Sequence, residues 1–187
     1  MLRFIRFVLC ICILANVQNS SAKEIIHARH ILTSAQNNIL YLWLKRHRNF
    51  RLATIQDCGC DEDVQMLRTG KLSGTPYPGF NPYRLVGDFN GDGKNDFAVV
   101  LVDDSKEGLE ERFALLVFNG YFSRKTSEPS FIQQDMKLSG YGLFFTPQQP
   151  QGPKPLGFAV VLFNSDVDLY LMPDEDTYRW EAIERGE

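Results

Sequence analysis

The residues best suited to chemistry lie in one short segment in the middle of the chain, residues 87–97. Side chains that carry oxygen occupy alternate positions there, Asp88, Asn90 and Asp92, and a fourth follows at Asp96. Hard cations such as Ca²⁺ take about six to eight oxygen ligands, and carboxylates, amides and backbone carbonyls supply them. The spacing therefore predicts a calcium-binding loop in this segment.

The positions of the other loop residues support this interpretation. Counted from Asp88 as position 1, Lys94 is at position 7, where the backbone carbonyl would face the cation while the ammonium points to water. Gly93 precedes it and permits the sharp turn that a Cβ would hinder. Asp96 would act on the metal directly or through a water molecule. The predicted metal ligands are Asp88, Asn90, Asp92, Asp96 and the carbonyl of Lys94.

This loop does not match an EF-hand, which needs a glutamate at position 12 and a helix on each side. Position 12 is Val99, inside an apolar run typical of a strand. Without that glutamate, we expect weak affinity, on the order of 10⁻⁴–10⁻³ M. A glycine-rich β-turn with aspartates that simply face water is the alternative, because Asn-Gly and Asp-Gly are hairpin signals by themselves.

The run Gly-Asp-Phe-Asn-Gly-Asp-Gly-Lys-Asn-Asp-Phe-Ala-Val, residues 87–99, resembles the calcium loop of FG-GAP or VCBS-type repeats. That family's pattern is Asp-x-Asp/Asn-x-Asp-Gly-x-x-Asp. The resemblance implies a loop between two strands whose acidic positions and one carbonyl bind Ca²⁺. Family propellers need several copies, and this chain has one, so the resemblance does not imply a propeller. The chain is also similar to short secreted bacterial proteins that carry one such loop.

Residues 1–22 have the three parts of a secretory signal peptide. Arg3 and Arg6 form a basic start, residues 7–15 are apolar, and a polar stretch then ends in small residues at Ala22. The apolar run is shorter than the roughly 20 residues that span a bilayer. We expect cleavage after Ala22 and a periplasmic or secreted protein; a retained anchor is the alternative.

The expected mature chain, residues 23–187, has a length that suits a single domain. The signal takes two of the 20 lysines and arginines with it, which leaves 18 against 23 acidic residues and a net charge of −5. A mildly acidic chain without a basic stripe does not favour binding to nucleic acid or to anionic membranes. We expect a monomer with no membrane span after cleavage.

Cys58 and Cys60 are the cysteines of the expected mature chain. They could pair in an oxidising compartment, whereas a zinc site would need about four ligands. A disulfide that closes so short a loop would stabilise the fold by only about 1–2 kcal/mol. It is therefore either a local staple or a pair kept for thiol exchange.

The periodicity predicts an α+β fold in which an N-terminal helix packs on a mostly antiparallel β-sheet. The helix is expected within residues 23–50, with Thr33 or Ser34 as its cap, and a short helix from Asp61 should end at Gly70. Residues 71–82 are expected to be loop. The predicted strands cover residues 49–56, 84–87, 97–102, 112–118, 141–146 and 156–163, and a hairpin over 168–172 and 177–182.

The sequence favours a binding protein over an enzyme without deciding the matter. It has neither a Gly-x-Ser-x-Gly elbow nor a His-Glu-x-x-His motif. We expect a non-catalytic interaction module with a structural Ca²⁺ site, whose ligand is an unidentified protein or glycan in the cell envelope. The alternatives are a secreted hydrolase with a structural calcium loop, using carboxylates of residues 61–63 and 174–176, and a thiol-redox protein using Cys58 and Cys60.

Overall fold

The computed structural model describes residues 31–72, 74–120, 128–145, 157–163 and 167–184. The predicted signal peptide, residues 1–22, lies outside this part of the chain. The helices are α1 (Ser34–Arg46), α2 (Ile55–Cys58), α3 (Asp61–Thr69) and the 3₁₀ helix η1 (Asp104–Lys106). The strands are β1 (Phe50–Leu52), β2 (Arg84–Gly87), β3 (Asp96–Asp103), β4 (Phe113–Phe118), β5 (Phe131–Met136), β6 (Tyr141–Phe145), β7 (Phe158–Leu162), β8 (Val167–Asp174) and β9 (Thr177–Glu184).

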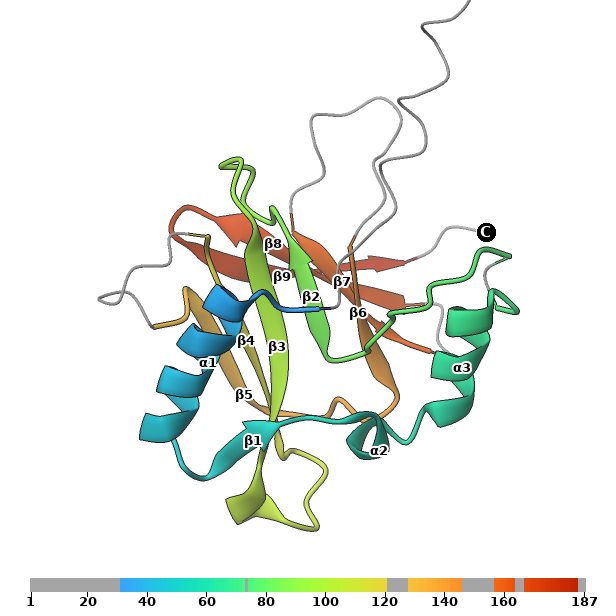
Figure 1. Cartoon of the computed structure of the whole chain (residues 1–187), viewed down its shortest axis with the longest axis horizontal. Coiled ribbons are helices and arrows are strands. Elements are labelled where there is room, and N and C mark those ends of the chain that lie inside the picture. The colour runs from blue at the N-terminus through green and yellow to red at the C-terminus, as the bar shows by residue number, and fades with distance from the viewer. Residues whose placement is uncertain (1–30, 73, 121–127, 146–156, 164–166, 185–187) are drawn as a thin grey trace, which may run out of the picture.

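The strands form two antiparallel sheets, which confirms the α+β class and an arrangement other than a propeller. The first sheet has the order β1-β3-β4-β5, and β2 also pairs with β3. On one edge of β3, β2 pairs with the first half and β1 with the second half. The second sheet has the order β6-β7-β8-β9. In Figure 1 the strands of the second sheet cross behind those of the first.

Helix α1 covers the outer face of the first sheet, as predicted. Its buried residues Ile39, Leu40 and Trp43 pack against side chains of β2, β3 and β4, among them Phe97 and Leu116. The spacing of these helical residues places them on one face. Figure 1 shows α1 lying alongside β3 and β4.

The main core lies between the two sheets. It includes Leu85, Val100 and Leu115 from the first sheet and Phe158 and Leu171 from the second, and α2 and α3 close it at one end. All eight residues of β3 are buried, because α1 covers one face of this strand and the second sheet covers the other. That position explains why β3 is apolar on both faces.

Local signals set several of the element ends. Thr33 caps α1 through a capping box in which its hydroxyl accepts from the Gln36 N–H and the Gln36 side chain accepts from the Thr33 N–H. Helix α3 begins with three acidic residues and ends at Gly70, whose φ of 78° is left-handed. In the described part of the chain no helix is both long and apolar enough to cross a membrane.

Three features differ from the sequence-based expectation. The strand predicted over residues 49–56 stops at Leu52, and Thr54 caps helix α2 instead. Strand β5 was not predicted, because its middle residues are exposed and mostly polar. The strands also form two sheets rather than one, since the second half of the chain pairs within itself.

Candidate metal site

The predicted calcium loop connects β2 to β3 and projects from one end of the first sheet (Figure 1). It therefore lies between two strands, as the resemblance implies. Gly91 and Gly93 both have left-handed backbone angles, with φ of 77° and 82°. Residues that carry a side chain rarely adopt this backbone conformation. The two glycines therefore allow the loop to fold back on itself.

Asp88 organises the first part of the loop. One of its carboxylate oxygens accepts a hydrogen bond of 2.8 Å from the Gly91 N–H, and the other accepts one of 2.9 Å from the Gly93 N–H. Asn90 Oδ1 accepts from the Asp92 N–H at 3.0 Å, and Asp92 Oδ1 accepts from the Lys94 N–H at 2.8 Å. The contacts of Asn90 and Asp92 are Asx turns, which such side chains form readily. The loop is thus shaped by its own predicted ligands.

Asp96 differs from the other predicted ligands because it is fully buried. Its Oδ2 accepts from the N–H groups of Phe89 at 2.8 Å and Asn90 at 3.3 Å, and its Oδ1 accepts from the Gly120 N–H at 2.7 Å. Burial raises the pKa of Asp96 to about 6, and the negative charge of Asp92 adds to this rise while the three N–H donors oppose it. Asp96 therefore joins the start of the loop to the end of β4.

Phe89 fixes the loop to the main core. Its side chain is fully buried, and its ring lies 4.8 Å from that of Phe158 on β7. Its carbonyl accepts a hydrogen bond of 2.7 Å from the Gly157 N–H. Phe89 is thus held by the second sheet, whereas Asp96 is part of β3 in the first sheet.

The Lys94 side chain is exposed and lies near another predicted ligand. Its ammonium lies 3.9 Å from Asp92 Oδ2, and both side chains are partly exposed. The ammonium therefore lies close to a predicted ligand while the side chain reaches solvent. A bound cation would compete with this weak ion pair.

The donor chemistry of the loop fits a hard cation. Each predicted ligand supplies oxygen, two of the side chains are carboxylates at the loop surface, and the glycines permit the turn. Among the described residues, no three His, Cys, Asp or Glu side chains gather as a metal site would require. The predicted set holds three such side chains, Asp88, Asp92 and the buried Asp96, which do not gather closely in this structure. It adds Asn90 and the Lys94 carbonyl, which are donors of other kinds.

Two residues outside the loop complete its surroundings, and sequence analysis did not select them. Gly120 donates to Asp96, and a Cβ at Gly120 would lie 2.6 Å from the Cβ of Lys94. The neighbouring Asn119 accepts from the hydroxyl of Tyr178 at 2.8 Å. The only signal in the sequence was the Asn-Gly pair at the end of β4, which predicts a turn and says nothing of its partners.

Cys58 and Cys60 form a disulfide at the end of α2, and Gly59 between them has a left-handed φ of 66°. Both cysteines are buried in the main core, with exposed fractions of 2% and 3%. The carbonyl of Cys58 also accepts from the Gly140 N–H at 2.8 Å. Thiol exchange needs access for a partner thiolate, so this burial favours the interpretation of a local staple.

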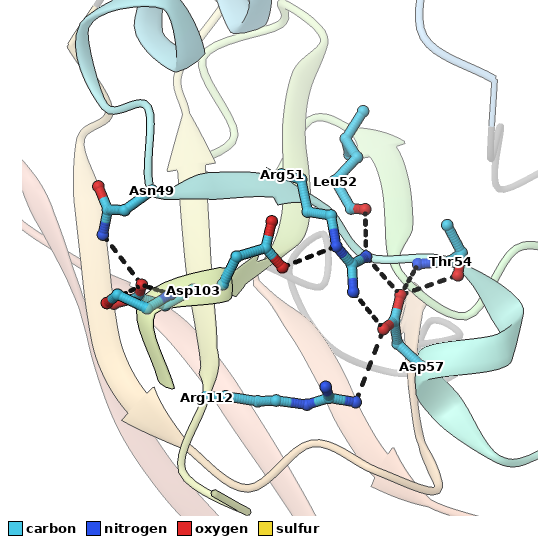
Figure 2. Close-up of polar contacts among 9 residues, drawn as sticks. Asn49, Arg51, Leu52, Thr54, Asp57, Asp103 and Arg112 are labelled. Carbon is cyan, nitrogen blue, oxygen red and sulfur yellow. Dashed lines mark hydrogen bonds and ion pairs between the residues drawn. The ribbon is translucent and has the colours of Figure 1, made fainter. Parts of the chain in front are cut away.

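A polar network next to the disulfide was also not predicted from the sequence. Arg51 donates two hydrogen bonds to the Asp57 carboxylate, at 2.7 and 2.8 Å, and one to Asp104 at 2.9 Å (Figure 2). Asp57 also accepts from the N–H and hydroxyl of Thr54, and Arg112 lies 3.6 Å from it. The hydrogen bonds from Arg51 lower the pKa of Asp57 well below its usual range.

The contacts of this network point to a structural role. The network joins β1, the start of α2, the η1 segment and the start of β4, which are remote in the sequence. A carboxylate that accepts from four donor groups is poorly placed to act as a base, since its oxygens are already satisfied. We therefore treat Asp57 as a residue that stabilises the fold.

The other candidates do not converge on a site. Aromatic side chains could form a binding patch for a glycan or a peptide, but Trp43, Phe80 and Tyr83 are buried in the cores. The acidic residues at 61–63 lie in the first turn of α3, and those at 174–176 are exposed at the β8–β9 turn. These positions are typical of solvated element ends.

Comparison with known proteins adds no identity: no family model, no curated protein and no solved structure matches the chain. The resemblance to FG-GAP and VCBS-type loops therefore stays confined to the loop residues.

Proposed function

We propose that this protein is a secreted or periplasmic domain whose β2–β3 loop binds one Ca²⁺, and that it acts as a non-catalytic interaction module. The observation that carries the proposal is the arrangement around Asp88, which accepts from the N–H groups of Gly91 and Gly93 and closes the loop on its first residue. Asn90 and Asp92 follow at alternate positions, each with an Asx turn. A water-facing turn does not need four such side chains.

In this proposal Asp88, Asn90, Asp92 and the Lys94 carbonyl hold the cation, and Asp96 acts on it directly or through water. The cation supplies positive charge that offsets the mutual repulsion of the loop carboxylates. The chain contributes the loop shape, through its glycines, and the rigid support, through Phe89 and Asp96. The role of the metal is structural because the loop residues would take up most of its coordination sphere.

The test is thermal unfolding of the mature chain in chelator and in 10 mM CaCl₂. Binding to the folded state stabilises it by RT ln(1 + [Ca²⁺]/Kd). With a Kd on the order of 10⁻⁴–10⁻³ M, the gain is about 1.4–2.7 kcal/mol, or roughly 3–10 °C in Tm. Asp92→Ala should remove the response, and Asp176→Ala, an exposed aspartate in the β8–β9 turn, should keep it. An equal response of Asp92→Ala and the wild type would overturn the ligand assignment.

The interaction role needs a separate experiment. The mature protein, immobilised with Ca²⁺ present, should enrich a protein or glycan from cell-envelope extract, and Asp92→Ala should enrich less of it. The absence of any enriched component from both proteins, with and without chelator, would contradict an interaction module while leaving the calcium site in place.

A further inference from the structure

A series of hydrogen bonds leads from the predicted calcium loop to the second sheet. Asp96, at the start of β3, accepts from the N–H of Gly120, and the adjacent Asn119 accepts from the hydroxyl of Tyr178 on β9. The two bonds measure 2.7 and 2.8 Å. We call these four residues the loop-to-sheet path.

The same carboxylate also controls the second contact between loop and sheet. Asp96 Oδ2 accepts from the N–H of Phe89, and the carbonyl of Phe89 accepts from the N–H of Gly157, just before β7. The ring of Phe89 packs on Phe158. Displacement of Asp96 would therefore disturb the second sheet at β7 and β9 together.

Both ends of the path are buried, and Asn119 and Gly120 between them are partly buried. Asp96 is fully buried and Tyr178 is only 5% exposed. Breaking a buried hydrogen bond leaves an unsatisfied group, which costs about 1–3 kcal/mol. The residues of the path consequently tend to move together, not one at a time. The negative charges of the loop also contribute, after burial, to raising the pKa of Tyr178, as expected of a hydroxyl that lies within their field.

Tyr178 lies at the seam between β9 and β5. Its ring meets Phe131 edge-on at 6.2 Å, and Phe131 meets Trp180 at the same distance. Trp180 Nε1 donates to Gln133 Oε1 at 3.0 Å, and the hydroxyl of Thr177 donates to the carbonyl of Ser130 at 3.3 Å. These contacts join the last strand of the second sheet to the edge strand of the first.

We propose that the state of the loop controls how firmly β9 packs against β5. This inference rests on the proposed calcium function: a bound cation holds the loop closed, Asp96 keeps its contact with Gly120, and Asn119 keeps Tyr178 in place. Without the cation, the unscreened carboxylates favour a looser loop and β9 loosens with it. A ligand shifts such an equilibrium only because it binds one of the two states better.

The test is hydrogen–deuterium exchange of the mature chain in 10 mM CaCl₂ and in chelator, with calorimetry of Ca²⁺ binding on the same samples. In the wild type, Ca²⁺ should slow exchange of β9 amides about five-fold, the equivalent of one typical hydrogen bond. Tyr178→Phe should bind Ca²⁺ as the wild type does but lose most of this protection. Asn119→Ala, which removes the acceptor instead of the donor, should give the same loss.

Tyr141→Phe is the matched control, because it removes a hydroxyl from β6 at the opposite edge of the same sheet. It should keep both the affinity and the protection. Full protection in Tyr178→Phe, or a wild-type β9 that does not respond although calorimetry records binding, would overturn the path and leave the calcium site intact. Absence of binding in the wild type would overturn the calcium function and the path with it.

Discussion

Asp96 and Gly120 are 24 positions apart, and a hydrogen bond of 2.7 Å joins the carboxylate of the first to the backbone N–H of the second. This contact brings the end of β4 against the end of the loop. There is no room between them for a side chain, because a Cβ at Gly120 would lie 3.0 Å from the carbonyl oxygen of Asn95 and 2.6 Å from the Cβ of Lys94. The site thus depends on a residue outside the loop.

Gly120→Ala is therefore expected to destabilise the protein by about 1–3 kcal/mol, since the new methyl group must displace backbone atoms. Chemical denaturation measures this loss. Gly79→Ala is the matched control, because a Cβ there meets nothing within 4 Å. Equal stability of the two variants would show that the close approach of β4 to the loop is not required.

Calcium affinity is expected to fall below about pH 6. Burial raises the pKa of Asp96 to about 6 in the metal-free protein, so a proton competes with the cation for this carboxylate. The apparent Kd should rise about ten-fold between pH 7 and pH 5. Calorimetry at the two pH values measures the change, and an unchanged Kd would mean that Asp96 does not act on the cation.

Protonation of Asp96 is expected to stabilise the metal-free protein, although it weakens calcium binding. Its folded-state pKa lies above the ordinary value of 3.8, so protonated Asp96 stabilises the fold below that value. This contribution is lost as the pH rises through about 6. In chelator, Asp96→Asn should remove this part of the pH dependence of Tm, which gives a check that needs no calcium.

Lys94→Gln is expected to tighten calcium binding about two- to four-fold. The Lys94 ammonium lies 3.9 Å from Asp92 Oδ2, and a partly exposed ion pair of this kind is worth about 0.2–1 kcal/mol. A cation no longer has to displace the ammonium in the variant. Lys137→Gln removes the same charge from a pair with Glu110 and Glu111, so it should leave the Kd unchanged. Weaker binding by Lys94→Gln would contradict this competition.

Asp57→Asn is expected to lower the free energy of unfolding by about 2 kcal/mol at pH 7, because the amide cannot accept both hydrogen bonds from Arg51. Those bonds lower the folded-state pKa of Asp57 below its ordinary value of 3.8. The stabilisation is therefore present above about pH 3.8 and is lost as the pH falls further. The gap between wild type and variant should be constant from pH 5 to 7 and should narrow in acid.

The control for Asp57 is Glu128→Gln, which removes the exposed ion pair with Arg46. Such pairs contribute about 0–1 kcal/mol, so this variant should lose little stability. The difference in unfolding free energy between it and the wild type should not narrow in acid. A loss as large as that of Asp57→Asn would mean that the network around Arg51 contributes no more stability than an exposed ion pair.

Much of the fold follows from neighbours in the sequence. The cap at Thr33, the stop at Gly70 and the apolar run of β3 each depend on residues a few positions apart, and the structure has all three as predicted. Strand β5 could not be predicted in this way. Its residues are mostly exposed at a sheet edge, so burial leaves no alternating pattern in the sequence.

The donors of the candidate site follow from the sequence alone, because oxygen side chains and glycines at short spacing shape a loop through hydrogen bonds between near neighbours. The residues that support this loop, in contrast, come together only in the folded chain. Gly120 is 24 positions from Asp96, and Tyr178 is 59 positions from Asn119. The first contact forms because β3 pairs with β4 within one sheet, and the second forms because the two sheets pack together. No local pattern of residues encodes either contact.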